Sequence, residues 1–135
     1  MVSNALITNV DFAPTLLGML GIEIPDSMQG KDLSGTLFRN PSKGNESVLI
    51  QYEHTYFRED PEKVFRTVVT HRWKYTYYLT MGPTMLFDLE NDPYEQRNLI
   101  DEKEYSPMKE KMHEILIEKL KEVKDTSLLQ RMGCR

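Results

Sequence analysis

A strongly amphipathic segment near the carboxyl end, residues 106–123, limits the possible folds of this chain more than any other feature. Ser106 and Pro107 are typical of a helix start, because the missing proline N–H costs little in the first turn. One face of this predicted helix mixes Lys and Glu at spacings of three and four, which keeps that face solvated, and the opposite face is apolar. A helix with one apolar face must pack on another element. The apolar residues of that face are Met108, Met112, Ile115, Leu116, Leu120 and Val123.

Upstream of this helix, four segments have the composition of β-strands. Aromatic and polar residues alternate most clearly in the third of them, as in a half-buried strand. His71 and Arg72 are the only residues between the second and third segments, which predicts a tight hairpin there. The Gly82-Pro83 turn separates the third segment from the fourth. The sequence therefore predicts an α+β fold, in which a small antiparallel sheet of about four strands packs against the long C-terminal helix. The expected strands are residues 47–52, 64–70, 73–79 and 85–89.

The N-terminal part predicts a second, separate helix over residues 11–21. Asp11 is a good N-cap, and Gly21 stands where a helix-ending glycine is expected. The stripe of apolar residues along 12–20 is broad, yet only ten residues precede the helix, so we expect a large neighbour that this chain lacks. The turn-rich residues 22–47 read as a connector.

These patterns divide the chain into three parts. Residues 1–45 are expected to be the end of a larger α/β lobe with its connector, residues 46–126 a C-terminal subdomain, and residues 127–135 a flexible tail. Within the subdomain, Asp92-Pro93-Tyr94-Glu95 predicts a helical turn opened by a capping-box variant.

Composition excludes several classes of protein. The net charge of −4 provides no general attraction for nucleic acid or anionic lipid. No apolar run approaches the roughly 20 residues that a membrane helix needs, and the first 30 residues lack the pattern of a signal peptide. The single cysteine, Cys134, excludes an internal disulfide and a multi-cysteine zinc site. The sequence does not assign a compartment.

Four segments carry motifs in a fixed order. Residues 4–33 contain D-x-x-P-T-L-L, then Gly, Pro and Gln-Gly; residues 65–78 read FRTVVTHRWKYTYY; residues 86–99 read LFDLENDPYEQRNL; and the amphipathic helix closes the series. In order and spacing they resemble the C-terminal part of the type I sulfatases, in the alkaline-phosphatase-like superfamily. Phe87 stands where that family usually has Tyr. The resemblance also implies that the helix of residues 11–21 packs on the catalytic lobe.

The resemblance implies a sulfuric ester hydrolase that uses a formylglycine nucleophile and a calcium ion. The nucleophile arises from the Cys or Ser of C/S-x-P-x-R, and this chain contains neither form of that motif. The metal-binding and sulfate-binding residues of the family also lie upstream of the matched region. We therefore expect no catalytic residue, no metal ligand and no cofactor in this chain, which alone should be inactive.

Three residues are candidate substrate contacts: His54, Arg66 and Lys74. His54 follows an expected strand, where loop residues reach ligands, although such a histidine is more often a plain surface residue. Arg66 and Lys74 match the basic residues of the family hairpin and could attract a sulfated substrate. The alternative, which we favour, is that they pair with acidic groups of the catalytic domain or with Asp88 and Glu90.

Other groupings have a structural interpretation that we favour. The acidic residues around the Asp60-Pro61 turn (Glu53, Glu59, Asp60 and Glu62) have no fixed mutual distance, and the acidic residues of 88–95 lack the spacing of a calcium loop. The aromatic residues of 73–78 could stack on sugars, but such a stripe is more often core packing against a helix.

We thus predict the C-terminal portion of a sulfatase, which completes the fold and shapes the rim of the substrate pocket. Its expected partners are the missing catalytic domain, or a second copy through the 12–20 stripe, and, in the intact enzyme, a sulfated small molecule or glycan. Two alternatives stay open: an autonomous binding module derived from a sulfatase, and a fragment of a phosphonate or phosphate ester hydrolase of the same superfamily.

Overall fold

The computed structural model describes residues 4–38, 44–53 and 64–133. The chain divides into two compact units, Met1–Val48 and Leu49–Arg135, and each is considered by itself.

The first unit contains α1 (Phe12–Leu20) and α2 (Ser34–Phe38), preceded by a short 3₁₀ turn, η1 (Asn9–Asp11). Helix α1 ends as the sequence predicts: Gly21 adopts φ 66°, and the next N–H, that of Ile22, bonds back to the carbonyl of Leu17 at 2.9 Å. Helix α2 lies within residues 22–47, where the sequence indicated only a connector.

Asp11 organises this unit, although not as the helix cap that the sequence suggested. Its side chain is buried and accepts hydrogen bonds from Thr8, from the backbone N–H of Lys31 (2.8 Å) and from the amide of Asn45 (3.0 Å). Burial raises the pKa of the Asp11 carboxyl, but these donors outweigh it and lower the pKa below its ordinary value. The carboxylate therefore joins three stretches of chain that are far apart in sequence.

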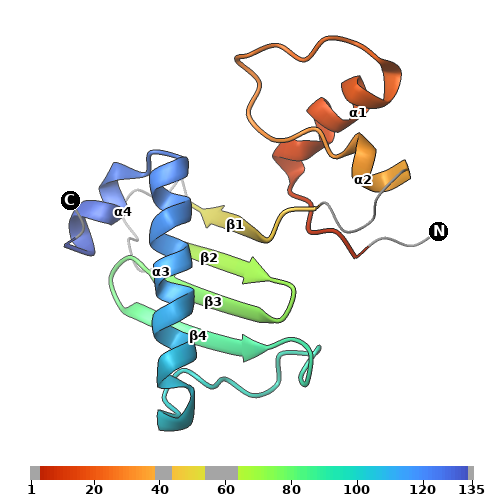
Figure 1. Ribbon diagram of the computed structural model, residues 1–135. Helices are drawn as coiled ribbons and strands as arrows, with labels where there is room; N and C mark the ends of the chain where they lie inside the picture. The colour runs from red at the N-terminus through yellow and green to blue at the C-terminus, as the bar shows by residue number, and fades with distance from the viewer. Residues whose placement is uncertain (1–3, 39–43, 54–63, 134–135) are drawn as a thin grey trace. The chain divides into compact units, whose positions relative to one another are not determined.

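The second unit is built on a four-stranded sheet in the order β1-β2-β3-β4 (Figure 1). The strands β2 and β3 pair antiparallel, as do β3 and β4. Strand β4 begins three residues earlier than expected; a register shift between Thr76 and Tyr77 brings Tyr77 opposite Pro83, which an edge strand tolerates. The strands are β1 (Ser47–Tyr52), β2 (Phe65–Thr70), β3 (Trp73–Tyr78) and β4 (Gly82–Asp88).

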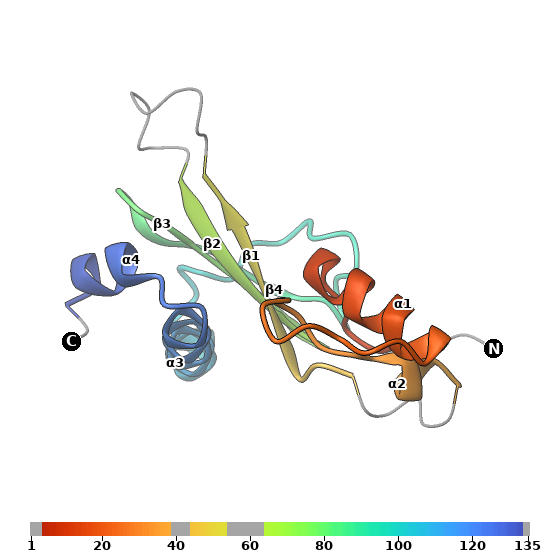
Figure 2. The ribbon, with the colours of Figure 1, turned by 90° about the horizontal axis from the view of Figure 1, so that it is seen from above.

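The long helix α3 (Ser106–Glu122) follows the 3₁₀ turn η3 (Lys103–Tyr105) and covers one face of this sheet (Figures 1 and 2). Its three fully buried side chains are Met112, Leu116 and Leu120, which belong to one core with Val68 and Leu86 of the sheet. This confirms the α+β fold that the sequence predicted. Val123, expected on the apolar face, follows the helix and is half exposed.

Residues 126–131 differ from the expected flexible tail. They form a short helix, α4 (Thr126–Arg131), in which Leu128 is 2% exposed and belongs to the core. The carboxylate of Asp125 caps this helix by accepting the N–H of Leu128 at 3.3 Å. The apolar Leu128 and the capping Asp125 together explain why the chain continues as ordered structure here.

Candidate functional site

The three candidate substrate contacts have different positions in the structure. His54 lies outside the described residues, as do Glu59, Asp60 and Glu62 of the acidic cluster. Arg66 and Lys74 are described, and each is engaged by an acidic side chain of the second unit.

Arg66 on β2 is a buried residue, 4% exposed. Its Nε donates to Asp125 Oδ2 at 2.7 Å, and its Nη1 donates to the backbone carbonyls of Tyr52 (3.2 Å) and Phe65 (3.1 Å). Glu53 lies 3.9 Å away. Three acceptors of the chain itself therefore hold this buried guanidinium.

Lys74 on β3 pairs with Glu95, with Nζ and Oε2 2.6 Å apart, and both side chains are about one-third exposed or less. The helical turn predicted at residues 92–95 is not formed, and Glu95 pairs with Lys74 instead. Glu95 has φ 54° and turns its carboxylate toward Lys74, while the Asp92 carboxylate accepts the N–H of Arg97 at 2.8 Å. The segment is therefore a turn without a helix.

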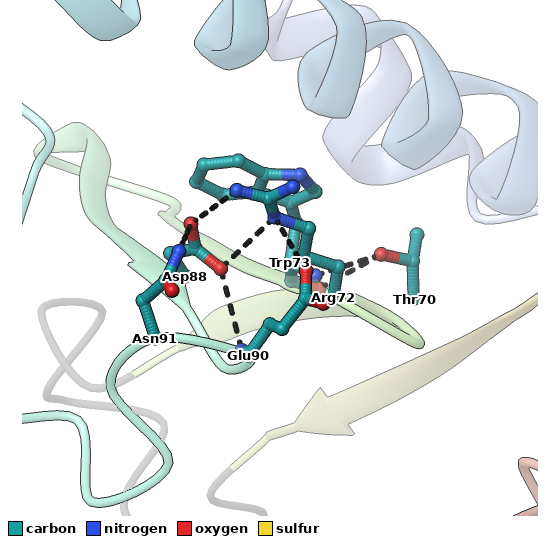
Figure 3. Close-up of polar contacts among 6 residues, drawn as sticks. All are labelled: Thr70, Arg72, Trp73, Asp88, Glu90 and Asn91. Atoms are coloured by element: carbon teal, nitrogen blue, oxygen red, sulfur yellow. Dashed lines mark hydrogen bonds and ion pairs between the residues drawn. The ribbon is translucent and has the colours of Figure 1, made fainter.

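The acidic residues Asp88 and Glu90, expected as partners of Arg66 or Lys74, instead surround Arg72 at the hairpin (Figure 3). Arg72 Nε and Nη2 donate to the two carboxylate oxygens of Asp88 at 3.1 and 2.8 Å, and Glu90 lies 3.3 Å from Nε. The guanidinium also lies over the Trp73 ring, 5.1 Å from its centre. Asn91 donates to Asp88 at 2.9 Å.

This network has a clear electrostatic effect. The hydrogen bonds from Arg72 lower the pKa of the buried Asp88 carboxyl from 3.8 to about 2, against the opposing effect of burial. Both carboxylate oxygens are engaged by donors from the hairpin and from the loop after β4. The cluster is an ion pair between Arg72 and Asp88 that fixes the hairpin to that loop.

The aromatic residues of β3 have the core role that we favoured over a sugar-binding platform. Trp73 packs on Tyr105, and Tyr75 and Tyr77 both contact the ring of His113 on α3. The Tyr75 hydroxyl and His113 Nδ1 are 2.9 Å apart, and burial lowers the pKa of His113 while it raises that of Tyr75. Sequence inspection did not single out His113, although its place next to Met112 on the packed face of the helix was the available signal.

The part of the chain that the structure describes brings together no group of three or more His, Cys, Asp or Glu residues that could hold a metal ion. Among the same residues, no helix combines the length and apolarity that crossing a bilayer requires.

Comparison with known proteins agrees with the motifs in the sequence. The family model described as "N-sulphoglucosamine sulphohydrolase, C-terminal" matches residues 1–122. An ulvan-active sulfatase of Formosa agariphila is 34% identical over 123 residues, which are 90% of this chain and 24% of that protein. The chain spans about a quarter of the length of the curated relatives it matches.

Solved structures share the fold. One, of an enzyme in complex with its substrate D-glucosamine-2-N,6-O-disulfate, superposes with a TM-score of 0.72 at 28% identity, over 87% of this chain and 24% of that one. The phosphonate monoester hydrolase of Agrobacterium radiobacter superposes with a TM-score of 0.61 at 22% identity, over 80% of this chain and 23% of that one, so it shares the fold alone.

Proposed function

The chain belongs to the sulfatase C-terminal family described as "N-sulphoglucosamine sulphohydrolase, C-terminal". We propose that in an intact enzyme it completes the fold and shapes the rim of the substrate pocket. The catalytic lobe, which this chain does not include, would carry out the hydrolysis of a sulfuric ester. Since the fold also occurs in a phosphonate monoester hydrolase, it does not by itself select the ester. The sequence identity with sulfatases favours sulfate.

One observation carries this proposal: α1 presents an uncovered apolar face. Phe12, Leu16 and Leu20 are 66%, 54% and 69% exposed, although they recur every fourth residue on one side of the helix. Full burial of such side chains contributes about 1.5–3 kcal/mol each, so covering these half-exposed ones is worth on the order of 1 kcal/mol each. Contiguous apolar surface of this kind marks an interaction site.

The occupant that we propose for this face is the catalytic lobe, because the relatives are about four times longer than this chain. Self-association through residues 12–20 is the alternative, and it would suit an autonomous binding module.

We further propose that calcium and the formylglycine nucleophile of the intact enzyme belong to residues outside this chain. The described residues assemble no metal-binding group, and the sequence lacks C/S-x-P-x-R. A sulfated glycan or small molecule is the proposed substrate, supported by the relatives active on ulvan and on a disulfated glucosamine. Of the three candidate contacts, Lys74 and His54 remain proposals, whereas the burial of Arg66 favours a structural role.

Sedimentation velocity of the chain over a range of concentrations, together with binding of an apolar dye, tests the uncovered face. We expect concentration-dependent association and strong dye binding, both reduced in a Leu16→Ser/Leu20→Ser variant with an unchanged melting temperature. A matched variant at an exposed polar position of the second unit, Gln130→Ala, should change neither. A clean monomer that binds little dye would count against both a missing lobe and an obligatory dimer.

The chain should also release no sulfate from an aryl sulfate, because it lacks the nucleophile. Turnover above that of buffer would refute the assignment of the chemistry to another part of the enzyme.

A further inference from the structure

The match to the family model stops at residue 122, where α3 also ends. The hydrophobic core continues beyond this point, because it includes Leu128. The chain reverses through Lys124 at φ 57°, and the N–H of Asp125 bonds to the carbonyl of Leu120 at 2.9 Å. This is the six-to-one bond of a Schellman turn, which here returns the chain toward the sheet. Residues 123–131, the C-terminal strap, then follow.

Asp125 is the central residue of this strap. Its side chain is 7% exposed, and its Oδ2 accepts hydrogen bonds from Arg66 Nε (2.7 Å) and from the amide of Gln51 (3.2 Å). Its Oδ1 caps α4. One carboxylate therefore connects β1, β2 and the start of α4.

Arg66 transmits this connection to the ends of two strands. Its Nη1 donates both to the carbonyl of Tyr52, the last residue of β1, and to that of Phe65, the first residue of β2. The Tyr52 and Phe65 rings also stack, with their centroids 5.2 Å apart. The orientation of the guanidinium depends on Asp125, because the ion pair at Nε is its shortest contact.

Leu128 provides the apolar half of the attachment. It is 2% exposed, belongs to the core with Leu120 and Leu116, and lines a small cavity together with Phe65, Arg66 and Leu79. The strap is thus attached at two points, one ionic and one apolar, both beside the same end of the sheet.

We propose that the C-terminal strap clamps the end of β1 and the start of β2, acting through Asp125 on Arg66. Without Asp125, the buried Arg66 guanidinium would keep, among the described residues, only the carboxylate of the exposed Glu53, 3.9 Å away, and breaking a buried ion pair in this way is costly. The guanidinium would then move toward solvent or toward the exposed Glu53, and its two carbonyl contacts would be lost. The loss should be greatest at β1, β2 and the start of α4, because the Asp125 carboxylate accepts hydrogen bonds from Gln51, Arg66 and Leu128.

Hydrogen exchange measured by mass spectrometry on the 135-residue chain tests this proposal. In an Asp125→Asn variant, amides of residues 49–53 and 64–67 should exchange about ten- to a hundredfold faster, as expected when a charge-assisted hydrogen bond in a buried pair is lost. Amides of residues 75–77 and 85–87 should keep their protection. Leu128→Ala should loosen the same peptides, and Gln130→Ala, on the exposed side of α4, should change none.

Three outcomes would overturn the proposal. Unchanged exchange in both Asp125→Asn and Leu128→Ala would mean that the strap holds nothing. Equal acceleration across all four strands, or complete unfolding of Asp125→Asn, would mean that the strap is part of the global core rather than a local clamp. Rescue supplies the positive control: Asp125→Glu should restore protection at residues 49–53 at least in part.

Discussion

Replacing Arg72 by Met should destabilise the second unit through the carboxylate of Asp88. The Asp88 side chain is 8% exposed and accepts two of its hydrogen bonds from Arg72. Once Arg72 is removed, Asn91 and the backbone N–H of Glu90 are the donors that remain. The methionine keeps much of the apolar contact with the Trp73 ring, so the substitution mainly tests the ion pair.

The pKa of Asp88 sets the upper limit of the effect. A fall from 3.8 to about 2 corresponds to at most about 2.4 kcal/mol at 1.36 kcal/mol per unit. Because the Arg72 side chain is 48% exposed, solvent screens the pair, and we expect about 1–1.5 kcal/mol. The matched control is Arg97→Met: Arg97 also makes two hydrogen bonds to one carboxylate, that of Glu102, but is 70% exposed, so its loss should cost about 0.5 kcal/mol or less.

The assay is urea unfolding, followed by the fluorescence of Trp73, at several pH values. The folded-state pKa of Asp88 lies below the unfolded one, so the pair stabilises the fold fully above about pH 4 and loses this contribution as the pH falls through about 2. The difference between wild type and Arg72→Met should therefore shrink between pH 4 and pH 2. A difference that is independent of pH, or equal to that of Arg97→Met, would refute this reasoning.

Three further predictions concern single residues of the second unit. Lys124→Gly should stabilise it by about 0.5–1 kcal/mol, since a glycine adopts φ 57° without steric cost; a lower melting temperature would contradict this. His113 has a lowered pKa, so stability should decline as the pH falls below about 6.5, and thermal melts of His113→Gln should show a weaker decline; equal declines would exclude His113 as the cause. Leu116→Ala, at a fully buried position, should cost about 2–5 kcal/mol in urea unfolding. Val123→Ala, half exposed, should cost well under 1 kcal/mol, and similar losses for both would contradict the packing described for α3.

Local patterns were sufficient to predict most of the fold. The spacing of Met112, Leu116 and Leu120 predicted the buried face of α3, and Gly21 predicted the end of α1, because periodicity and capping act over a few residues. The sheet followed from β-rich segments with a two-residue hairpin between β2 and β3.

Contacts between distant residues could not be predicted in the same way. Ion pairing was the favoured role for Arg66 and Lys74, but their partners Asp125 and Glu95 lie 59 and 21 residues away, and composition does not select among the 21 acidic residues. The capping motif at Asp92 was misleading: Glu95 pairs with Lys74, and the Asp92 carboxylate accepts the N–H of Arg97 in a turn that is not a helix. The ordered α4 had a local signal, Asp125 three residues before Leu128, but its burial depends on the sheet.

The central claim is that this chain is the C-terminal domain of a larger sulfatase. The most direct test is the mass of the native polypeptide in the cells that make it, detected with an antibody raised against this chain. We expect a species roughly four times the 15.8 kDa of the chain, because the chain covers 24% of a relative, with C/S-x-P-x-R in frame upstream. A species near 15.8 kDa would contradict it and would favour a binding module that covers its α1 face with another copy or another protein.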